Sequence, residues 1–292
     1  MTQTAFKTIA VVGGSGGLGA YLVRALLAAK FDVRVISRPE SQAASLSELA
    51  AAGATIVRAD TSNHDQLVAA LRGAEVVIAS YGITTLAEQF KLIPAAAAAG
   101  VRRYVTGDFG IDPRDAKVPR PFIQFKNDVA AAAAAAGLET TRIYNASFAD
   151  TTFYDWANLD VASGKITIPG DGTARTAFAH RADVAGFTAA ALLHPELSKN
   201  AELAIASDIL TWNEVVATAR KYRPDLQVEY SPLDAIQAKI AADPNPWNTV
   251  VLQLLYIFGS GENALTHGSD ADKVGYKTTH TLDSTLAAQL KQ

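Results

Sequence analysis

Residues 9–28, IAVVGGSGGLGAYLVRALLA, decide which fold this chain adopts. The run at residues 9–12 is short, apolar and uninterrupted, which is typical of a strand that is buried on both faces. Glycines follow at once, and from Leu18 onward apolar residues recur at helical spacing. A glycine-rich turn between a buried strand and a helix points backbone N–H groups at a bound pyrophosphate. The stretch therefore predicts an α/β fold that binds a dinucleotide.

The glycine cluster satisfies two overlapping spacings, GxxGxxG from Gly13 and GxGxxG from Gly14. Such spacings are common by themselves, and the strand before and the helix after make this one specific. The first glycine permits a sharp turn, the second lets backbone approach the pyrophosphate, and the third lets the helix pack closely on the sheet. We expect every residue of the loop to contact the cofactor: Gly13, Gly14, Ser15, Gly16, Gly17, Leu18 and Gly19.

The end of the next predicted strand distinguishes NADP from NAD. That strand covers residues 33–36 and ends at Ser37 and Arg38. NAD sites usually have an acidic residue there to bind a ribose hydroxyl, whereas a guanidinium suits a 2′-phosphate. The strand end itself has no acidic residue, because Glu40 comes only after Pro39. We therefore expect NADP(H) as the cofactor; the alternative is that Arg38 is an ordinary solvated arginine.

The composition is that of a globular protein, with 49% hydrophobic and 19% charged residues among 292. The net charge of −3 gives no basic field for nucleic acid or an anionic membrane. Cysteine is absent and the five histidines are scattered, so we expect no disulfide and no metal site. Because the first strand starts near residue 7 and no apolar run could cross a bilayer, we expect a cytoplasmic protein without a signal peptide.

Strands and helices alternate along the first half of the chain. Strands are predicted at 54–60, 74–82, 101–110 and 138–148, and a helix and a strand follow at 180–194 and 201–207. This alternation predicts a Rossmann-type doubly wound parallel sheet with a smaller C-terminal substrate region. We expect an NADP-binding domain at 1–150 that returns at about 180–207, with 151–179 and 208–292 binding the substrate.

Side chains that follow the strands are candidates for cofactor binding, because ligands bind outside the carboxyl ends of parallel strands. Besides the glycine loop, these candidates are Arg38, Asp60, Ser80, Tyr81, Gly82, Thr106, Lys126 and Asn145. An aspartate in the position of Asp60 also often caps the following helix. We expect His180, at the start of a helix, to have a capping or packing role; the alternative is a contact with the cofactor or substrate.

Lys126 lies in the first turns of the helix predicted by RPFIQFKNDVAAAAAAAG (120–137), where the helix dipole disfavours a positive charge. Two roles are open: the ammonium reaches solvent, or it is buried with a lowered pKa and donates a proton. Aromatic side chains near the predicted strand ends are candidates for a substrate pocket. These are Phe109, Phe148, Phe153 and Tyr154.

Four segments together, VVGGSGGLG, VISRPES, RYVTGDFGID and FKNDVAAAAAAAGLETTRIYNASFAD, resemble the NmrA-like group of atypical short-chain dehydrogenases/reductases. The resemblance is greatest to the isoflavone reductase-like branch, which includes pinoresinol–lariciresinol and phenylcoumaran benzylic ether reductases. It continues through HRADVAGFTAAAL and TWNEVVATARKY, over nearly the whole chain. It implies an NADPH-dependent reductase of a small aromatic, apolar substrate. The family's catalytic lysine corresponds to Lys126, and its strand-end segment R-F-x-P-S-E-F-G corresponds to Arg103, Tyr104, Asp108, Phe109 and Gly110.

Two departures from the family patterns bear on the chemistry. Phe122 stands where most short-chain dehydrogenases have the tyrosine of Tyr-x-x-x-Lys, so the resemblance implies chemistry by lysine alone. Thr106 and Gly107 replace the Pro-Ser pair. A second function stays open, that of an NADP(H)-binding redox sensor or regulator without turnover, and non-redox chemistry is a third. The sequence does not choose between a monomer and a homodimer, nor does it name the substrate or the bond reduced.

Overall fold

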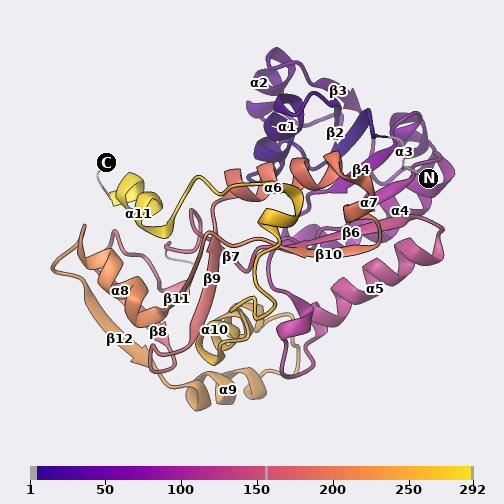
Figure 1. The fold of residues 1–292 in the computed structure, drawn as a ribbon. Coiled ribbons are helices and arrows are strands. Elements are labelled where there is room, and N and C mark those ends of the chain that lie inside the picture. The colour runs from indigo at the N-terminus through magenta and orange to yellow at the C-terminus, as the bar shows by residue number, and fades with distance from the viewer. Residues whose placement is uncertain (1–4, 155–156, 291–292) are drawn as a thin grey trace.

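The computed structural model describes residues 5–154 and 157–290. Its first half alternates strand and helix as predicted (Figure 1). The strands of the large sheet are β1 (Thr8–Val12), β2 (Asp32–Ser37), β3 (Thr55–Arg58), β4 (Val76–Ala79), β5 (Arg103–Val105), β6 (Glu139–Tyr144) and β10 (Ala201–Ala204). The helices that belong with them are α1 (Gly19–Ala28), α2 (Ser45–Ala51), α3 (His64–Leu71), α4 (Gln89–Ala98), α5 (Pro121–Ala135), α6 (Arg181–Leu193) and α7 (Pro195–Ser198).

In the described part of the chain, seven strands form one sheet in the order β10-β6-β5-β4-β1-β2-β3. Every neighbouring pair is parallel. The chain starts in the middle at β1, runs outward through β2 and β3, and then continues on the other side from β4. The strand order therefore reverses between β1 and β4, which is where such sheets bind ligands. The predicted Rossmann-type, doubly wound sheet is confirmed.

Strand β1 shows why helices cover both faces of the sheet. Ile9 and Val11 belong to the hydrophobic core that also contains Leu22 of α1 and residues of α6. Ala10 and Val12 belong to a second core, formed with side chains of α3, α4 and α5. Successive side chains of a strand point to opposite faces. The uninterrupted apolar run of β1 is thus buried on both faces, as the sequence predicted.

The remaining elements form two small sheets and a group of helices, in the lower part of Figure 1. The strands are β7 (Ser147–Phe148), β8 (Lys165–Pro169), β9 (Arg175–Ala179), β11 (Asp208–Thr211) and β12 (Gln227–Ser231). The helices are α8 (Trp212–Arg220), α9 (Leu233–Ala242), α10 (Val250–Ser260) and α11 (Leu282–Leu290). They have their own core around Trp212, whose Nε1 donates to the carbonyl of Phe258 at 3.0 Å. The division of the chain into a cofactor domain and a substrate region stays a prediction.

Residues 5–154 and 157–290 contain neither a membrane-spanning helix nor a group of side chains placed to bind a metal ion. No helix there combines the length and the hydropathy that crossing a bilayer requires. No group of three or more histidine or carboxylate side chains in those residues is placed to hold a metal ion.

Candidate cofactor groove and substrate pocket

The glycine loop turns the chain from β1 into α1 at the point where the strand order reverses. Gly13 has a φ of +79°, and a Cβ on it would lie 2.2 Å from the carbonyl oxygen of Ser80. A Cβ on Gly19 would lie 2.1 Å from the carbonyl oxygen of Gly13. Neither position admits a side chain, so the turn and the close helix packing predicted for the first and third glycines are confirmed. Gly14, in contrast, faces the core, where its nearest neighbours are side-chain atoms of Val35 and Val23.

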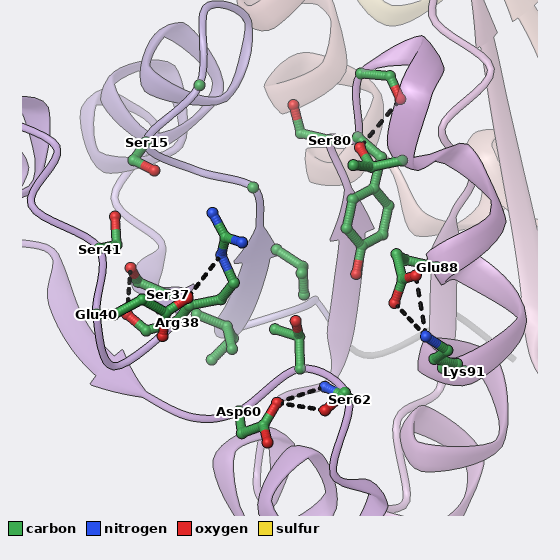
Figure 2. Close-up of a pocket in the computed structure, with 18 residues that line it drawn as sticks. Ser15, Ser37, Arg38, Glu40, Ser41, Asp60, Ser62, Ser80, Glu88 and Lys91 are labelled. Carbon is green, nitrogen blue, oxygen red and sulfur yellow. Dashed lines mark hydrogen bonds and ion pairs between the residues drawn. The ribbon is translucent and has the colours of Figure 1, made fainter.

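A groove of about 600 Å³ runs along the carboxyl ends of β1, β2, β3 and β4 (Figure 2). Its volume is that of a typical small-molecule or cofactor site. Most of the predicted cofactor-binding residues line it: Gly13, Ser15, Gly16, Arg38, Asp60, Ser80, Tyr81 and Gly82. The other predicted residues of the loop do not line it: Gly14, Gly17, Leu18 and Gly19.

Arg38 lies in the groove at the end of β2 and pairs with an acidic neighbour. Its Nε is 3.4 Å from Oε1 of Glu40, and both side chains are 68% exposed. The turn after β2 brings Glu40 back into the groove, although the sequence placed it beyond the strand end. Arg58 of β3 fixes this turn, since its Nη1 donates to the carbonyls of Arg38 at 3.0 Å and Ser41 at 2.9 Å. Arg58 is not among the candidates predicted from the sequence, although it ends the neighbouring strand.

Asp60 does not cap the following helix. Asn63 does so, accepting from the backbone N–H of Gln66 at 3.1 Å. Asp60 instead accepts from the hydroxyl and the N–H of Ser62, at 2.7 and 2.8 Å, and these hydrogen bonds lower the pKa of its carboxyl. Its carboxylate lies in the groove (Figure 2).

The far end of the groove contains residues that the sequence analysis did not select. The 3-10 helix η1 (Ile83–Glu88) follows β4 directly, and Thr85 and Glu88 line the groove with Lys91. The Nζ of Lys91 lies 3.0 Å from both carboxylate oxygens of Glu88. The signal that could have identified them is their position just after Gly82, at a strand end already recognised.

A second cavity, of about 210 Å³, meets the groove at Tyr81, which lines both. Its aromatic lining comprises Tyr81, Phe109, Phe122, Phe148 and Phe258. Lys126 is its one charged lining residue in the part of the chain that the structure describes. The two phenylalanines predicted here, Phe109 and Phe148, thus lie beside the candidate lysine.

The ammonium of Lys126 is held by backbone carbonyls. Its Nζ donates to the carbonyl of Asp108 at 2.7 Å and, more weakly, to that of Ile111 at 3.5 Å. Burial lowers the pKa of Lys126; Asp108 and Asp112 oppose this shift and Arg142 adds to it. Lys126 is half-buried, and its catalytic role stays a prediction.

A buried charge network lies behind Lys126. The carboxylate of Asp108 accepts from Nε of Arg142 at 2.7 Å, and Nη1 of Arg142 donates to Glu202 at 2.9 Å. Nη2 of Arg142 donates to the side-chain oxygen of Asn127, the residue after the lysine, at 3.0 Å. This network ties the turn that presents the Asp108 carbonyl to α5, and it thereby positions Lys126.

Outside the glycine loop, four predicted site residues line neither cavity. Thr106 is buried and donates to Oδ2 of Asp108 at 2.6 Å, so its hydroxyl belongs to the charge network and lines neither cavity. Asn145 is fully buried and also lines neither cavity. Phe153 packs on Phe178 in the core of the small sheets, with ring centroids 5.7 Å apart, because the chain turns inward after β7. Tyr154 is 49% exposed and lines neither cavity.

The capping role expected of His180 is confirmed. It is the N-cap of α6, and its Nδ1 accepts from the backbone N–H of Ala182 at 3.1 Å. Its ring stacks on that of His280, with centroids 4.1 Å apart.

The groove fits the cofactor that the sequence predicts. A tight glycine turn lies at its centre, and Arg38 lines it just after β2. Comparison with known proteins agrees, since residues 5–281 match the model of the NmrA-like family. The chain belongs to the NmrA-like family.

Two curated relatives have names that describe their chemistry. Eugenol synthase 1 of Petunia hybrida is 28% identical over 257 residues, which cover 83% of each chain. Phenylcoumaran benzylic ether reductase PT1 of Pinus taeda is 29% identical over 270 residues, which cover 87% of each chain. The resemblance of this NmrA-like protein to the isoflavone reductase-like branch is thereby confirmed, in agreement with the prediction of an oxidoreductase.

A solved structure shows the same fold with ligands bound. AtPrR2, solved with NADP⁺ and (+)-pinoresinol, is 25% identical and superimposes with a TM-score of 0.83, covering 98% of this chain and 99% of its own. Its bound NADP⁺ agrees with the prediction of NADP(H) as the cofactor of this NmrA-like protein.

Proposed function

We propose that the protein is an NADPH-dependent reductase of a small aromatic, apolar substrate, with Lys126 as the proton donor or relay. One observation carries the proposal: the half-buried Lys126 lines an aromatic pocket that meets the groove at Tyr81. A nucleotide groove alone would serve a sensor equally well. A lysine in the aromatic pocket beside it has an evident use in catalysis, whereas a pure sensor has no evident need for an ammonium there.

The groove provides the contacts that an NADP(H) molecule requires. The backbone of the glycine loop would hold the pyrophosphate, and Arg38 would hold the 2′-phosphate by charge-assisted hydrogen bonds. When bound, the cofactor supplies a hydride. The pocket beyond Tyr81 then has to orient the acceptor, exclude water and supply a proton.

Lys126 can supply that proton. An ammonium has three N–H donors, and the carbonyls of Asp108 and Ile111 occupy two of them. The third is left for a substrate oxygen or for a proton relay. Burial lowers the pKa of Lys126 and so makes release of the proton easier near neutral pH. Phe122 lines the pocket without a phenol, and burial raises the pKa of Tyr81, which keeps that phenol protonated.

The lining of the pocket indicates the substrate class. Its walls are mainly aromatic and aliphatic, and they include Ile83, Leu86 and Leu254. Such walls favour an uncharged aromatic ring, which stacks on phenylalanine and needs few polar partners. A substrate oxygen placed at Lys126 would take up the transferred proton. Reduction of a carbonyl, of an enone or of a benzylic ether would each satisfy this arrangement.

A substrate panel tests the proposal. Aromatic aldehydes, aromatic enones and lignan-type benzylic ethers are incubated with the protein and NADPH, and oxidation is followed by the loss of NADPH absorbance. We expect turnover of at least one class, with one NADPH consumed for each product formed. Tight NADPH binding without oxidation across the panel would instead favour a regulator that binds NADP(H) without turnover.

A further inference from the structure

Arg181, the first residue of α6, lies against the glycine loop. Helix α6 packs on α1, which brings its N-terminus beside the loop (Figure 1). A Cβ built on Gly17 would lie 2.7 Å from Nη1 of Arg181. The guanidinium is held in place from two sides: Nε donates to Oδ2 of Asp150 at 2.7 Å, and the guanidinium carbon lies 5.3 Å from the ring centroid of Tyr21.

The position of Arg181 accounts for a glycine that the loop geometry does not require. Gly17 has no left-handed φ, and it is outside the spacing formed by Gly13, Gly16 and Gly19. Arg181 supplies every described atom within 4 Å of a Cβ at Gly17. Any larger residue there would displace the guanidinium. Gly17 therefore serves to admit the side chain of Arg181.

Several hydrogen-bond donors around Arg181 have no acceptor in the described part of the chain. Among the described residues, the N–H groups of Gly17 and Leu18 have no acceptor, and Nη1 and Nη2 of Arg181 have none either. The side chain of Asp150 contacts only Nε of the Arg181 guanidinium, and its Oδ2 also lies 3.5 Å from Nε2 of His180. A phosphate group accepts hydrogen bonds from donors of both kinds, namely backbone N–H groups at the start of a helix and an arginine guanidinium.

We propose that Arg181 binds the pyrophosphate of the dinucleotide together with the backbone of Gly17 and Leu18. This inference rests on the proposed use of NADP(H). The cofactor is then held by two guanidinium groups with separate tasks: Arg38 contacts the 2′-phosphate and Arg181 the pyrophosphate. Asp150 positions Arg181, and it lies in the segment whose neighbours Phe148 and Thr151 line the Lys126 pocket.

Two ligands separate the tasks of the two arginines. NADPH has both the 2′-phosphate and the pyrophosphate, whereas adenosine 2′-monophosphate has only the former. Dissociation constants for both are measured by fluorescence titration. We expect Arg181→Met to weaken NADPH binding roughly 10- to 50-fold, the scale of a charge-assisted contact, and to leave adenosine 2′-monophosphate unaffected. Arg38→Met should weaken the binding of both.

Two further variants keep the test decisive if Arg181→Met lowers stability. Gly17→Ala retains Arg181 and Asp150, but the new Cβ would displace the guanidinium. We expect the affinity for NADPH to fall about tenfold. Combining Gly17→Ala with Arg181→Met should cause no further loss of affinity, because both act on the same contact. Arg24→Met is the matched control, because it removes an exposed charge from α1 that pairs with Glu48.

The outcomes distinguish this inference from the proposed function. Unchanged NADPH binding by Arg181→Met and Gly17→Ala, with tight binding by the unmodified protein, overturns the role of Arg181 alone. An equal loss for both ligands also overturns it, because Arg181 would then shape the whole groove. Failure of the unmodified protein to bind NADPH overturns both the proposed cofactor and this inference.

Discussion

The groove and the Lys126 pocket meet at Tyr81 but are built in opposite ways. The groove is lined by polar side chains and exposed ion pairs, such as that of Arg38 with Glu40. The pocket is lined by apolar side chains around one ammonium, with a buried charge network behind it. Solvent screens charges in the groove, so each contact there contributes little by itself. A charge in the pocket acts through a medium of low dielectric constant, where one group has a larger effect.

This contrast predicts different consequences of substitution. Changes in the groove should alter cofactor affinity by modest, nearly independent factors. Changes at Lys126 should alter turnover by a large factor and leave cofactor binding nearly intact.

The largest effect is expected for Lys126→Ala. If Lys126 handles the proton, kcat should fall roughly 100-fold or more, the usual scale for a positioned proton donor. NADPH should still bind, because the groove is unchanged apart from at most one weak contact. Lys126→Arg should restore little activity, since a guanidinium stays protonated and has another shape. Near-normal turnover by Lys126→Ala would remove the lysine from the mechanism.

The pH dependence of kcat tests the same role of Lys126 as proton donor. The ammonium is the donating form, so kcat should fall as the pH rises through the pKa of Lys126, which burial has lowered. The alkaline limb of the profile of kcat against pH should therefore have its midpoint below the pKa of an exposed lysine. Arg142→Gln should move this limb to higher pH, because it removes a cation near Lys126 and leaves the carboxylate of Asp108 uncompensated.

Asn127→Ala is the control for that shift. It removes a hydrogen bond to Arg142 without changing a charge, so the limb should stay in place. Both variants are checked first by circular dichroism, because breaking a buried ion pair costs about 3–5 kcal/mol of stability. If folded Arg142→Gln has the same alkaline limb as the unmodified protein, a group other than Lys126 is responsible for that limb.

In the groove, Arg38→Ala should have a smaller effect, confined to binding. We expect the affinity for NADPH to fall roughly tenfold, and the affinity for NADH, which has no 2′-phosphate, to stay the same. Most of the preference for NADPH over NADH should thus disappear. The measurement is a pair of fluorescence titrations, with Arg24→Met as the variant of equal charge. Equal affinities for the two cofactors in the unmodified protein would show that Arg38 does not bind the phosphate.

The large sheet and the groove could be predicted from sequence because their signals are local. The strand before Gly13, the turn and the helix after it are contiguous, and most of the residues that line the groove directly follow strand ends. Lys126 was selected from its unfavourable place near a helix N-terminus and from the family resemblance, and it lines the aromatic pocket; its catalytic role stays a prediction.

The pocket was harder to predict because distant segments form it. Phe258 comes from α10, and no periodicity in the sequence indicates that this helix returns to Lys126. Phe153 and Phe148 are alike in type and close in sequence, yet only Phe148 lines the pocket, because β7 pairs with β9 and turns the chain inward. Thr106 was misplaced because the sequence does not reveal the buried carboxylate that its hydroxyl contacts.

The smallest expected effect on NADPH affinity is that of Glu40→Gln, which should raise the affinity instead of lowering it. Glu40 pairs with Arg38 at 3.4 Å, so it competes with a 2′-phosphate for the guanidinium and repels the phosphate. Because both side chains are 68% exposed, the pair is worth little, and Glu40→Gln should strengthen NADPH binding only about two- to threefold. NADH binding should not change, and the gain should shrink at high salt. Glu48→Gln, which removes an exposed carboxylate on α2, is the control. Weaker NADPH binding by Glu40→Gln would mean that Glu40 positions Arg38 for the phosphate instead of competing with it.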